Sequence, residues 1–181
     1  MKVRELFLLV ADDLKQDKRL GALNLVERAF FDLSFRLTLN YRLRRFFNIR
    51  GGRFSRIIEK YLKKKQLKHY SCLISSDAII GRHVRFPHPT GIVIGGGVQI
   101  GNFVDVYQHV TIGSHGKKGL DMAYPIIEDN AKIFAGSTVI GGIVVGKKSV
   151  IGANSVVAIN VPADGIAVGS PARVLDASKS L

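Results

Sequence analysis

Hydrophobic residues recur at every sixth position over most of the sequence after residue 73. With two interruptions, the series runs through Ile74, Ile80 and Phe86, then Ile94, Ile100, Val106 and Ile112, then Ile127, Ile133, Val139, Val145, Ile151 and Val157. One apolar residue per hexamer indicates a short strand and a turn, with a single side chain pointing inward. Three hexamers make a triangular coil, and stacked coils bury a continuous core. The pattern predicts a parallel β-helix.

Small residues mark the turns of this repeat. The residue after the inward position is often glycine, as at Gly95, Gly101, Gly113, Gly146 and Gly152. The fourth position of the hexamer, where turns crowd, holds Ala131, Ser137, Ser149 and Ser155. Because the glycines recur at a period, they indicate ordered turns rather than a disordered chain.

The first 70 residues have a helical period instead. Apolar residues at helical spacing predict helices over residues 6–14, 25–47 and 53–68, with Gly21 and the pair Gly51-Gly52 as breaks. We therefore expect a basic α-helical domain at residues 1–70 and a β-helix at residues 71–163. A protruding loop is expected at residues 113–126, and residues 164–181 form a C-terminal tail.

The positive charge of the chain lies almost entirely in its helical part. The net charge is +13, and residues 1–70 hold 18 Lys and Arg against 7 Asp and Glu. Two interpretations stay open: the helices pack on each other and on the β-helix, or their basic residues face an anionic membrane surface. The second would use Arg42, Arg44, Arg45, Arg50, Arg53, Arg56 and the lysines at 63–65. No recognition motif accompanies the charge, so nucleic acid is not an expected partner.

Cys72 is the only cysteine, so an internal disulfide is excluded and a reducing compartment is favoured. We find no signal peptide and no apolar run long enough to cross a bilayer. The sequence predicts a cytoplasmic protein, peripheral at the inner face of the cell membrane if the basic helices bind there.

Three segments carry a family resemblance. Residues 88–95 read HPTGIVIG, residues 108–113 read QHVTIG, and residues 165–174 read GIAVGSPARV. With these motifs the chain resembles the hexapeptide-repeat acyltransferases, and among them the serine acetyltransferase branch. The resemblance implies a left-handed β-helix, a trimer with active sites between neighbouring coils, acetyl-CoA as acyl donor and no metal. It also implies that His88 is the general base on an acceptor hydroxyl, with direct transfer of the acetyl group.

The chain departs from that branch where the acceptor binds. Serine acetyltransferases carry an Asp before the catalytic His, where this chain has Pro87, and a second Asp that would fall near Leu73. Their Arg-His pair falls at about Ala123 and Tyr124. A free amino acid needs partners for its carboxylate and its ammonium group. We therefore expect a sugar acceptor, as in the capsule and exopolysaccharide (colanic-acid-type) O-acetyltransferases, carried on a lipid-linked glycan.

The resemblance also assigns binding residues. The donor would contact Gly113, Ser114, Ala135, Gly136 and Ala153, of which Ala135 and Ala153 are 18 apart and hence stacked. Its phosphates would meet Lys148 and Arg173, with Lys147 a further candidate, or the lysines are simply solvated turns. On the acceptor side we expect Gln108, stacked above His88, together with His109, His115 and Tyr124. His109 either lines the pocket or stands on the coil surface. His115 touches either the acceptor or a neighbouring subunit.

Alternative functions remain. The first is serine O-acetylation in cysteine biosynthesis, and the second is a catalytically silent β-helix scaffold. A third is a γ-carbonic-anhydrase-like zinc enzyme, for which His88, His109 and His115 supply the number of ligands but not the spacing. A homotrimer is the expected assembly, with the helices able to join trimers into hexamers.

Overall fold

A computed structural model describes residues 2–15, 22–116 and 123–175. Four helices come first: α1 (Val3–Leu14), α2 (Ala22–Phe31), α3 (Leu33–Arg50) and α4 (Arg53–Tyr70). Fourteen short strands follow among the described residues: β1 (Leu73–Ile74), β2 (Ile79–Ile80), β3 (Val93–Ile94), β4 (Gln99–Ile100), β5 (Asp105–Val106), β6 (Thr111–Gly113), β7 (Ile126–Ile127), β8 (Lys132–Ile133), β9 (Thr138–Ile140), β10 (Val144–Val145), β11 (Val150–Ile151), β12 (Val156–Val157), β13 (Ile166–Gly169) and β14 (Ala172–Leu175).

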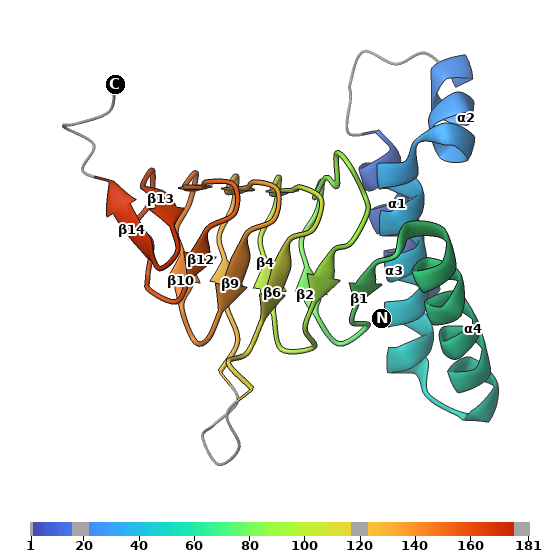
Figure 1. Ribbon diagram of the computed structural model, residues 1–181. Coiled ribbons are helices and arrows are strands. Elements are labelled where there is room, and N and C mark those ends of the chain that lie inside the picture. The colour runs from blue at the N-terminus through green and yellow to red at the C-terminus, as the bar shows by residue number, and fades with distance from the viewer. Residues whose placement is uncertain (1, 16–21, 117–122, 176–181) are drawn as a thin grey trace.

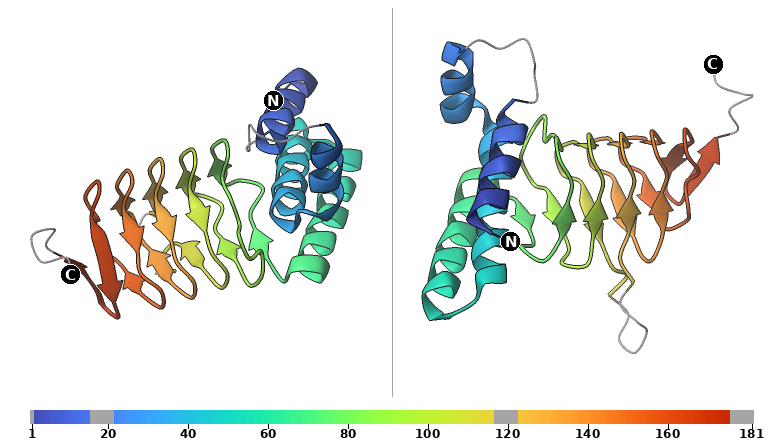
Figure 2. Two further views of the ribbon diagram at one scale, coloured as in Figure 1. Left: turned by 90° about the horizontal axis from the view of Figure 1, so that it is seen from above. Right: turned by 180° about the vertical axis from the view of Figure 1, so that it is seen from behind.

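The strands wind into a left-handed β-helix with three flat faces (Figures 1 and 2). The first sheet holds β1, β3, β6, β9 and β12, the second β2, β4, β7 and β10, and the third β5, β8, β11, β13 and β14. Neighbouring strands are parallel, except that β13 and β14 form an antiparallel pair at the C-terminal end. All thirteen residues of the six-residue series are buried, so the predicted inward positions are confirmed.

The helices cover the open N-terminal end of the β-helix (Figure 2). The terminal coil of a β-helix leaves strand carbonyls without partners, and these must be capped. Side chains of α3 supply those donors: Tyr41 Oη donates to the Ala78 carbonyl at 2.7 Å, and Arg44 Nη1 to the Ile74 carbonyl at 2.6 Å. Arg42 Nη1 donates to the Ile80 carbonyl at 2.6 Å. Helix α3 is therefore the cap of the first coil.

Buried ion pairs hold this cap in place. Arg42 pairs with Asp13 of α1 at 2.9 Å, and Arg44 pairs with Glu59 of α4 at 2.8 Å. Both arginines are only 2% exposed. The interpretation that places them on a membrane surface is wrong for these two residues, because their charges are neutralised inside the helix bundle. Arg45 also turns inward, to the carbonyls of residues 76–78.

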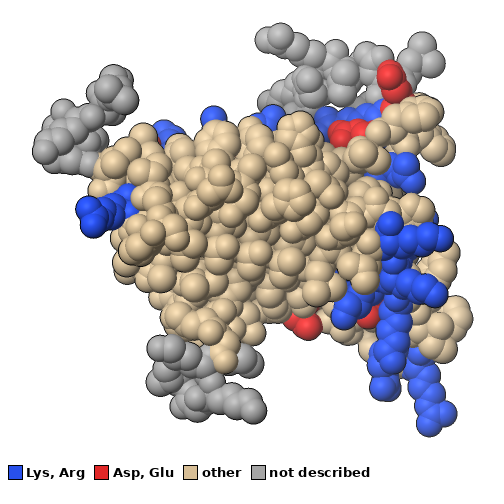
Figure 3. Space-filling model, in the orientation of Figure 1, with Lys and Arg blue, Asp and Glu red and all other residues tan. Residues whose placement is uncertain are grey.

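Most of the other basic residues in that interpretation form an exposed surface on α4, and Arg50 is exposed at the end of α3. Figure 3 shows Lys and Arg gathered over the helical end of the molecule, while the β-helix face in view is largely without them. The exposed basic residues of α4 are Arg53, Arg56, Lys60, Lys63, Lys64, Lys65 and Lys68. Within the described ranges, none of the helices has the length and apolar character needed to cross a bilayer.

Two segments differ from the sequence-based expectation. The single helix predicted over residues 25–47 is two helices, because Asp32 caps the start of α3 and its Oδ1 accepts from the amides of Ser34 and Phe35. Asp32 follows a phenylalanine pair, so the apolar pattern runs through the break. Of the predicted loop at 113–126, residues 117–122 lie outside the described part of the chain, as do residues 176–181 of the predicted tail.

Candidate active site

His88 lies on a bulge of the β-helix. Arg85 pairs with Asp105, 20 residues on, whereas Val93 pairs with Thr111 at the regular separation of 18. Two extra residues must therefore be accommodated between Arg85 and Val93. They form the bend that contains Pro87 and Pro89, and this bend leaves the His88 side chain exposed. The insertion therefore places the His88 imidazole on a protruding bend.

A hollow of about 540 Å³ separates this bulge from the helices. Helix α3 contributes its N-terminus, with Asp32, Leu33 and Ser34, and the end of α4 contributes His69, Tyr70 and Ser71; residues 87–90 complete the wall. Ser34 Oγ accepts from the Phe86 amide at 2.9 Å, which fixes α3 beside the bulge. The helical residues of this wall are absent from the sequence-based site, because they lie far from His88 in the sequence and carry no motif.

Aromatic rings continue from His88 along the coils. The rings of His88 and Tyr107 are 6.2 Å apart, and Tyr107 stacks on Phe134 at 4.9 Å. Tyr107 and Phe134 each follow a strand of the third sheet, so they occupy the same position in successive coils. Beside them, Arg85 forms two 2.6 Å hydrogen bonds to the buried Asp105, and these bonds raise the pKa of Arg85. This aromatic shelf was not predicted either.

The corner between the third and first sheets aligns several predicted residues. The His109 amide donates to the Thr90 carbonyl, the Gly136 amide to Gln108, and the Asn154 amide to Ala135. Residues 90, 108, 135 and 153 therefore form one column, and the predicted stacking of Ala135 and Ala153 is confirmed. The predicted stacking of Gln108 on His88 is wrong: Gln108 stacks on Thr90, because the inserted residues precede Thr90.

Glycines in the adjoining column make room for larger side chains. Gly91 has a φ of +66°, and a Cβ there would fall 2.2 Å from Nδ1 of His109. The His109 ring thus lies on Gly91, at the exposed corner of the coil. At Gly136, whose φ is +71°, a Cβ would meet Oδ1 of Asn154 at 2.2 Å. Both glycines are required by a left-handed backbone and by a close neighbour.

Other predicted site residues lie at different corners of the same chain. Gly113, Ser114, His115 and Tyr124 are at the corner between the first and second sheets. There the Tyr124 ring packs on Gly97, where a Cβ would fall 2.2 Å from the ring, and His115 packs on Gly141 in the same way. Lys147 and Lys148 stand at the corner between the second and third sheets, and Arg173 lies opposite Val168 on β14.

One chain therefore brings together only part of the predicted site. His88, Gln108, His109, Ala135, Gly136 and Ala153 share a corner. The remainder are on other edges of the triangle, and the three histidines of the zinc alternative are divided between two corners. In the described part of the chain, no three His, Cys, Asp or Glu side chains gather as a metal site would require.

The chain is similar to bacterial hexapeptide-repeat transferases and to serine acetyltransferases. The family model "Bacterial transferase hexapeptide (six repeats)" matches residues 124–158. The serine acetyltransferase of Buchnera aphidicola (Acyrthosiphon pisum) is 41% identical over 115 residues, covering 64% of this chain and 42% of that protein. That of Bacillus subtilis is 47% identical over 103 residues, covering 56% and 46%. The chain thus spans less than half the length of these curated relatives.

Solved structures extend the similarity to the helices. Soybean serine acetyltransferase as apoenzyme superimposes with a TM-score of 0.82 at 31% identity, covering 95% of this chain and 69% of that one. The same protein in complex with serine also gives a TM-score of 0.82, at 30% identity over 95% and 70%. These findings overturn the prediction of a sugar or lipid-linked glycan acceptor and of a colanic-acid-type enzyme. The relatives are serine acetyltransferases, and the departures at Pro87, Leu73 and Tyr124 do not move the chain out of their branch.

Proposed function

We propose that this chain, which belongs to the serine acetyltransferase-like branch of the hexapeptide-repeat transferases, transfers the acetyl group of acetyl-CoA to the hydroxyl of L-serine. The observation that supports this most directly is the exposed imidazole of His88. It stands on a two-residue bulge at the edge of a hollow, in a chain whose relatives are serine acetyltransferases.

The reaction requires His88 to act first as a base. Its imidazole accepts the proton of the serine hydroxyl while the oxygen attacks the thioester carbonyl of acetyl-CoA. The tetrahedral intermediate collapses as the C–S bond breaks, and the imidazolium returns the proton to the departing CoA sulfur. The products are O-acetylserine and CoA, and no covalent intermediate with the protein forms. Exposure of His88 is needed because both substrates must reach its nitrogen.

The column beside His88 offers a surface for the donor. Ala135 and Ala153 present small side chains there, so an extended chain can approach their backbone closely, whereas Gly136 lies in the adjoining column under Asn154. Gln108, in the same column, has a buried Oε1 that accepts no hydrogen bond within the described part of the chain. A buried acceptor without a partner costs about 1–3 kcal/mol, which a bound amide N–H would recover. We assign the pantetheine arm of acetyl-CoA to this column.

The ammonium group of serine needs a carboxylate partner. Pro87 and Leu73, which stand where serine acetyltransferases carry aspartates, cannot supply one. Asp32 is the one acidic side chain among the described residues that line the His88 hollow. Its side chain is 31% exposed although it pairs with Arg28 at 3.1 Å. We assign the serine ammonium group to Asp32, a residue that reaches the site from the helical domain.

A trimer would complete this site. The edge of the first sheet opposite His88 carries Gly113, Ser114, His115 and Tyr124. A single chain therefore cannot bring these four residues and His88 to the same substrate molecule. A closed ring of three chains sets one edge of each triangle against a different edge of its neighbour. We propose that these four residues of one chain lie against the His88 corner of the adjacent chain.

The test is release of CoA thiol from acetyl-CoA, with and without L-serine, by the wild type and the His88→Asn variant. Loss of a general base should lower kcat about 10²–10⁴-fold. His83→Asn is the matched control, because His83 stacks on Phe103 at another corner; its activity should equal that of the wild type. A wild-type protein that binds acetyl-CoA but releases no thiol with L-serine would refute the proposed function.

A further inference from the structure

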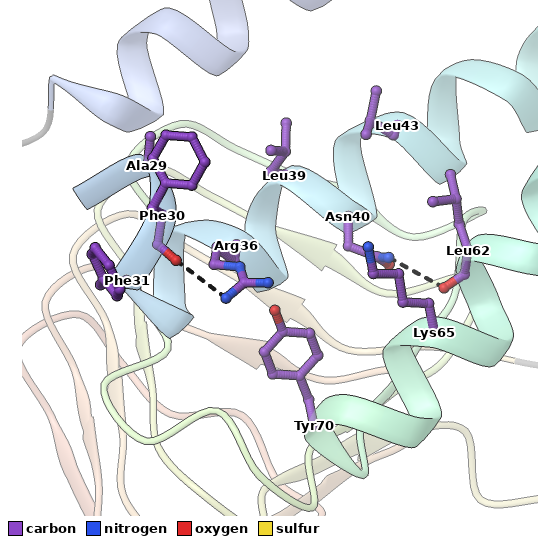
Figure 4. Close-up of a pocket in the computed structure, with 10 residues that line it drawn as sticks. All are labelled: Ala29, Phe30, Phe31, Arg36, Leu39, Asn40, Leu43, Leu62, Lys65 and Tyr70. Carbon is purple, nitrogen blue, oxygen red and sulfur yellow. Dashed lines mark hydrogen bonds between the residues drawn. The ribbon is translucent and has the colours of Figure 1, made fainter. Parts of the chain in front are cut away.

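A second hollow, of about 390 Å³, lies between α2, α3 and α4 (Figure 4). It is lined by Ala29, Phe30, Phe31, Arg36, Leu39, Asn40, Leu43, Leu62, Lys65 and Tyr70. Its volume is in the range of small-molecule sites, about 300–1,000 Å³. Of these residues only Tyr70 also lines the His88 hollow, so the two hollows share a wall but are distinct.

The charged groups of this hollow have one sign. Arg36 and Lys65 line it, and none of its described lining residues is acidic. Arg36 Nη1 donates to the Phe30 carbonyl at 3.1 Å, which holds the guanidinium in place while other N–H groups face the hollow. Arg36 and Lys65 come from different helices, so the fold itself brings the two cations together.

Tyr70 adds a polar group at the same place. Its hydroxyl points toward the Arg36 guanidinium (Figure 4). Burial raises the pKa of Tyr70, and the nearby Arg36 charge opposes that rise. The phenol therefore remains a hydrogen-bond donor at neutral pH, next to a fixed cation. A planar, bidentate guanidinium with a hydroxyl beside it matches the geometry of a carboxylate.

Apart from Asn40, the rest of the lining is apolar. Leu39 and Leu43 on α3 and Leu62 on α4 supply aliphatic surface, and α2 supplies Ala29 and two aromatic rings. Phe30 and Phe31 are 66% and 77% exposed, so much of this apolar area stays in contact with water. A hydrocarbon chain bound in the hollow would remove part of this apolar lining from water, which is favourable.

We propose that this hollow is a binding site for a small aliphatic carboxylate, with the carboxylate on Arg36, Lys65 and Tyr70 and the chain against Leu39, Leu43 and Leu62. The site does not depend on the acetyl-transfer function, because its cations and aliphatic residues are separate from His88. Asn40 is already engaged, donating from Nδ2 to the Leu62 carbonyl at 3.2 Å, and so serves to hold α4 against α3.

Calorimetric titration of the full-length protein with octanoate tests the proposal, with 1-octanol as a neutral ligand of the same chain length and acetate as an anion without the chain. Octanoate should bind at least about tenfold more tightly than either, since both the charge and the chain are needed. Equal affinity for octanoate and 1-octanol would reveal hydrophobic partitioning only and would overturn the proposal.

Two variants locate the site. Arg36→Gln and Lys65→Gln should each weaken octanoate binding about tenfold. Lys63→Gln is the matched control, because Lys63 is an exposed lysine of α4 that does not line the hollow, and its affinity should be unchanged. Lys65 is an exposed residue of α4, so this variant remains informative if Arg36→Gln disturbs α2. Wild-type affinity in both variants, or no octanoate binding by the wild type, would overturn the proposal. Occlusion of the hollow by a second copy of the chain in solution would also overturn it.

Discussion

Replacing Arg42 with methionine tests whether buried charge fastens the helices to the β-helix. Arg42 Nε donates to Asp13 at 2.9 Å, Nη1 donates to the Ile80 carbonyl at 2.6 Å, and Nη2 donates to the Gly81 carbonyl. Asp13 in turn accepts from the His83 amide at 3.1 Å. One guanidinium thus joins α1, α3 and the first coil. Methionine keeps the aliphatic stem but removes every donor.

The expected cost follows from what is left behind. The variant leaves the Asp13 carboxylate, 5% exposed, without its cation, and it removes the arginine donor from one buried and one partly buried carbonyl. Removing one partner of a buried ion pair costs about 3–5 kcal/mol. The free energy of unfolding should fall by about 4 kcal/mol, a large share of the 5–15 kcal/mol typical of a folded protein. Arg42→Met with Asp13→Leu should recover part of this loss, because no unpaired charge then remains buried.

Urea unfolding followed by the helical far-UV circular dichroism signal is a suitable assay, because the chain has no tryptophan. The protein concentration must be the same for all variants, since assembly adds to apparent stability. Arg56→Met is the control: Arg56 is an exposed residue of α4, and its loss should change stability by less than about 0.5 kcal/mol. A loss below about 1 kcal/mol for Arg42→Met, or no recovery in the double variant, would refute the reasoning.

Two further predictions concern alkaline stability and assembly. The Tyr41 hydroxyl donates to the Ala78 carbonyl and accepts from the Ile80 amide, and burial raises its pKa above the ordinary 10.0. The contribution of the Tyr41 hydroxyl to the free energy of unfolding is therefore complete below about pH 10, and it is lost as the pH rises through the raised pKa. Tyr41→Phe should cost about 1–2 kcal/mol in neutral urea unfolding and flatten the alkaline decline; an unchanged alkaline slope would contradict this. Separately, co-assembly of His88→Asn with Ser114→Trp chains should restore about a quarter of wild-type activity, because random trimers form intact sites between unlike chains. Absence of any recovery would place the whole site within one chain.

Local pattern was sufficient for the β-helix. Each inward residue of the six-residue series is buried because a short strand and a turn repeat along most of the β-helix, and burial needs only the period. The helical structure of the N-terminal segment was predictable because its apolar residues follow a helical period. The break at Asp32 was missed because a helix cap adjoining an apolar run does not interrupt the helical period.

The site required tertiary information. Gln108 was assigned to the column of His88, but the position of a two-residue insertion within a turn depends on which carbonyls the next coil binds. Nothing in the local sequence specifies that choice. The acceptor prediction was wrong for a related reason. It treated the residues missing at Pro87 and Leu73 as evidence for another substrate, whereas a carboxylate can enter the His88 hollow from α3, as Asp32 does.

By itself, the sequence determined the repeat, the inward face and the helical character of the first 70 residues, because each rests on residue types at short, regular spacing. The general-base candidate came instead from the family resemblance of the HPTG motif. Only the tertiary structure decided which charges are buried and which are solvated. Arg42 and Arg56 have the same side chain, yet one is held by Asp13 and two carbonyls while the other faces water. That difference depends on contacts between residues tens of positions apart, which the packing of α1, α3 and the first coil creates.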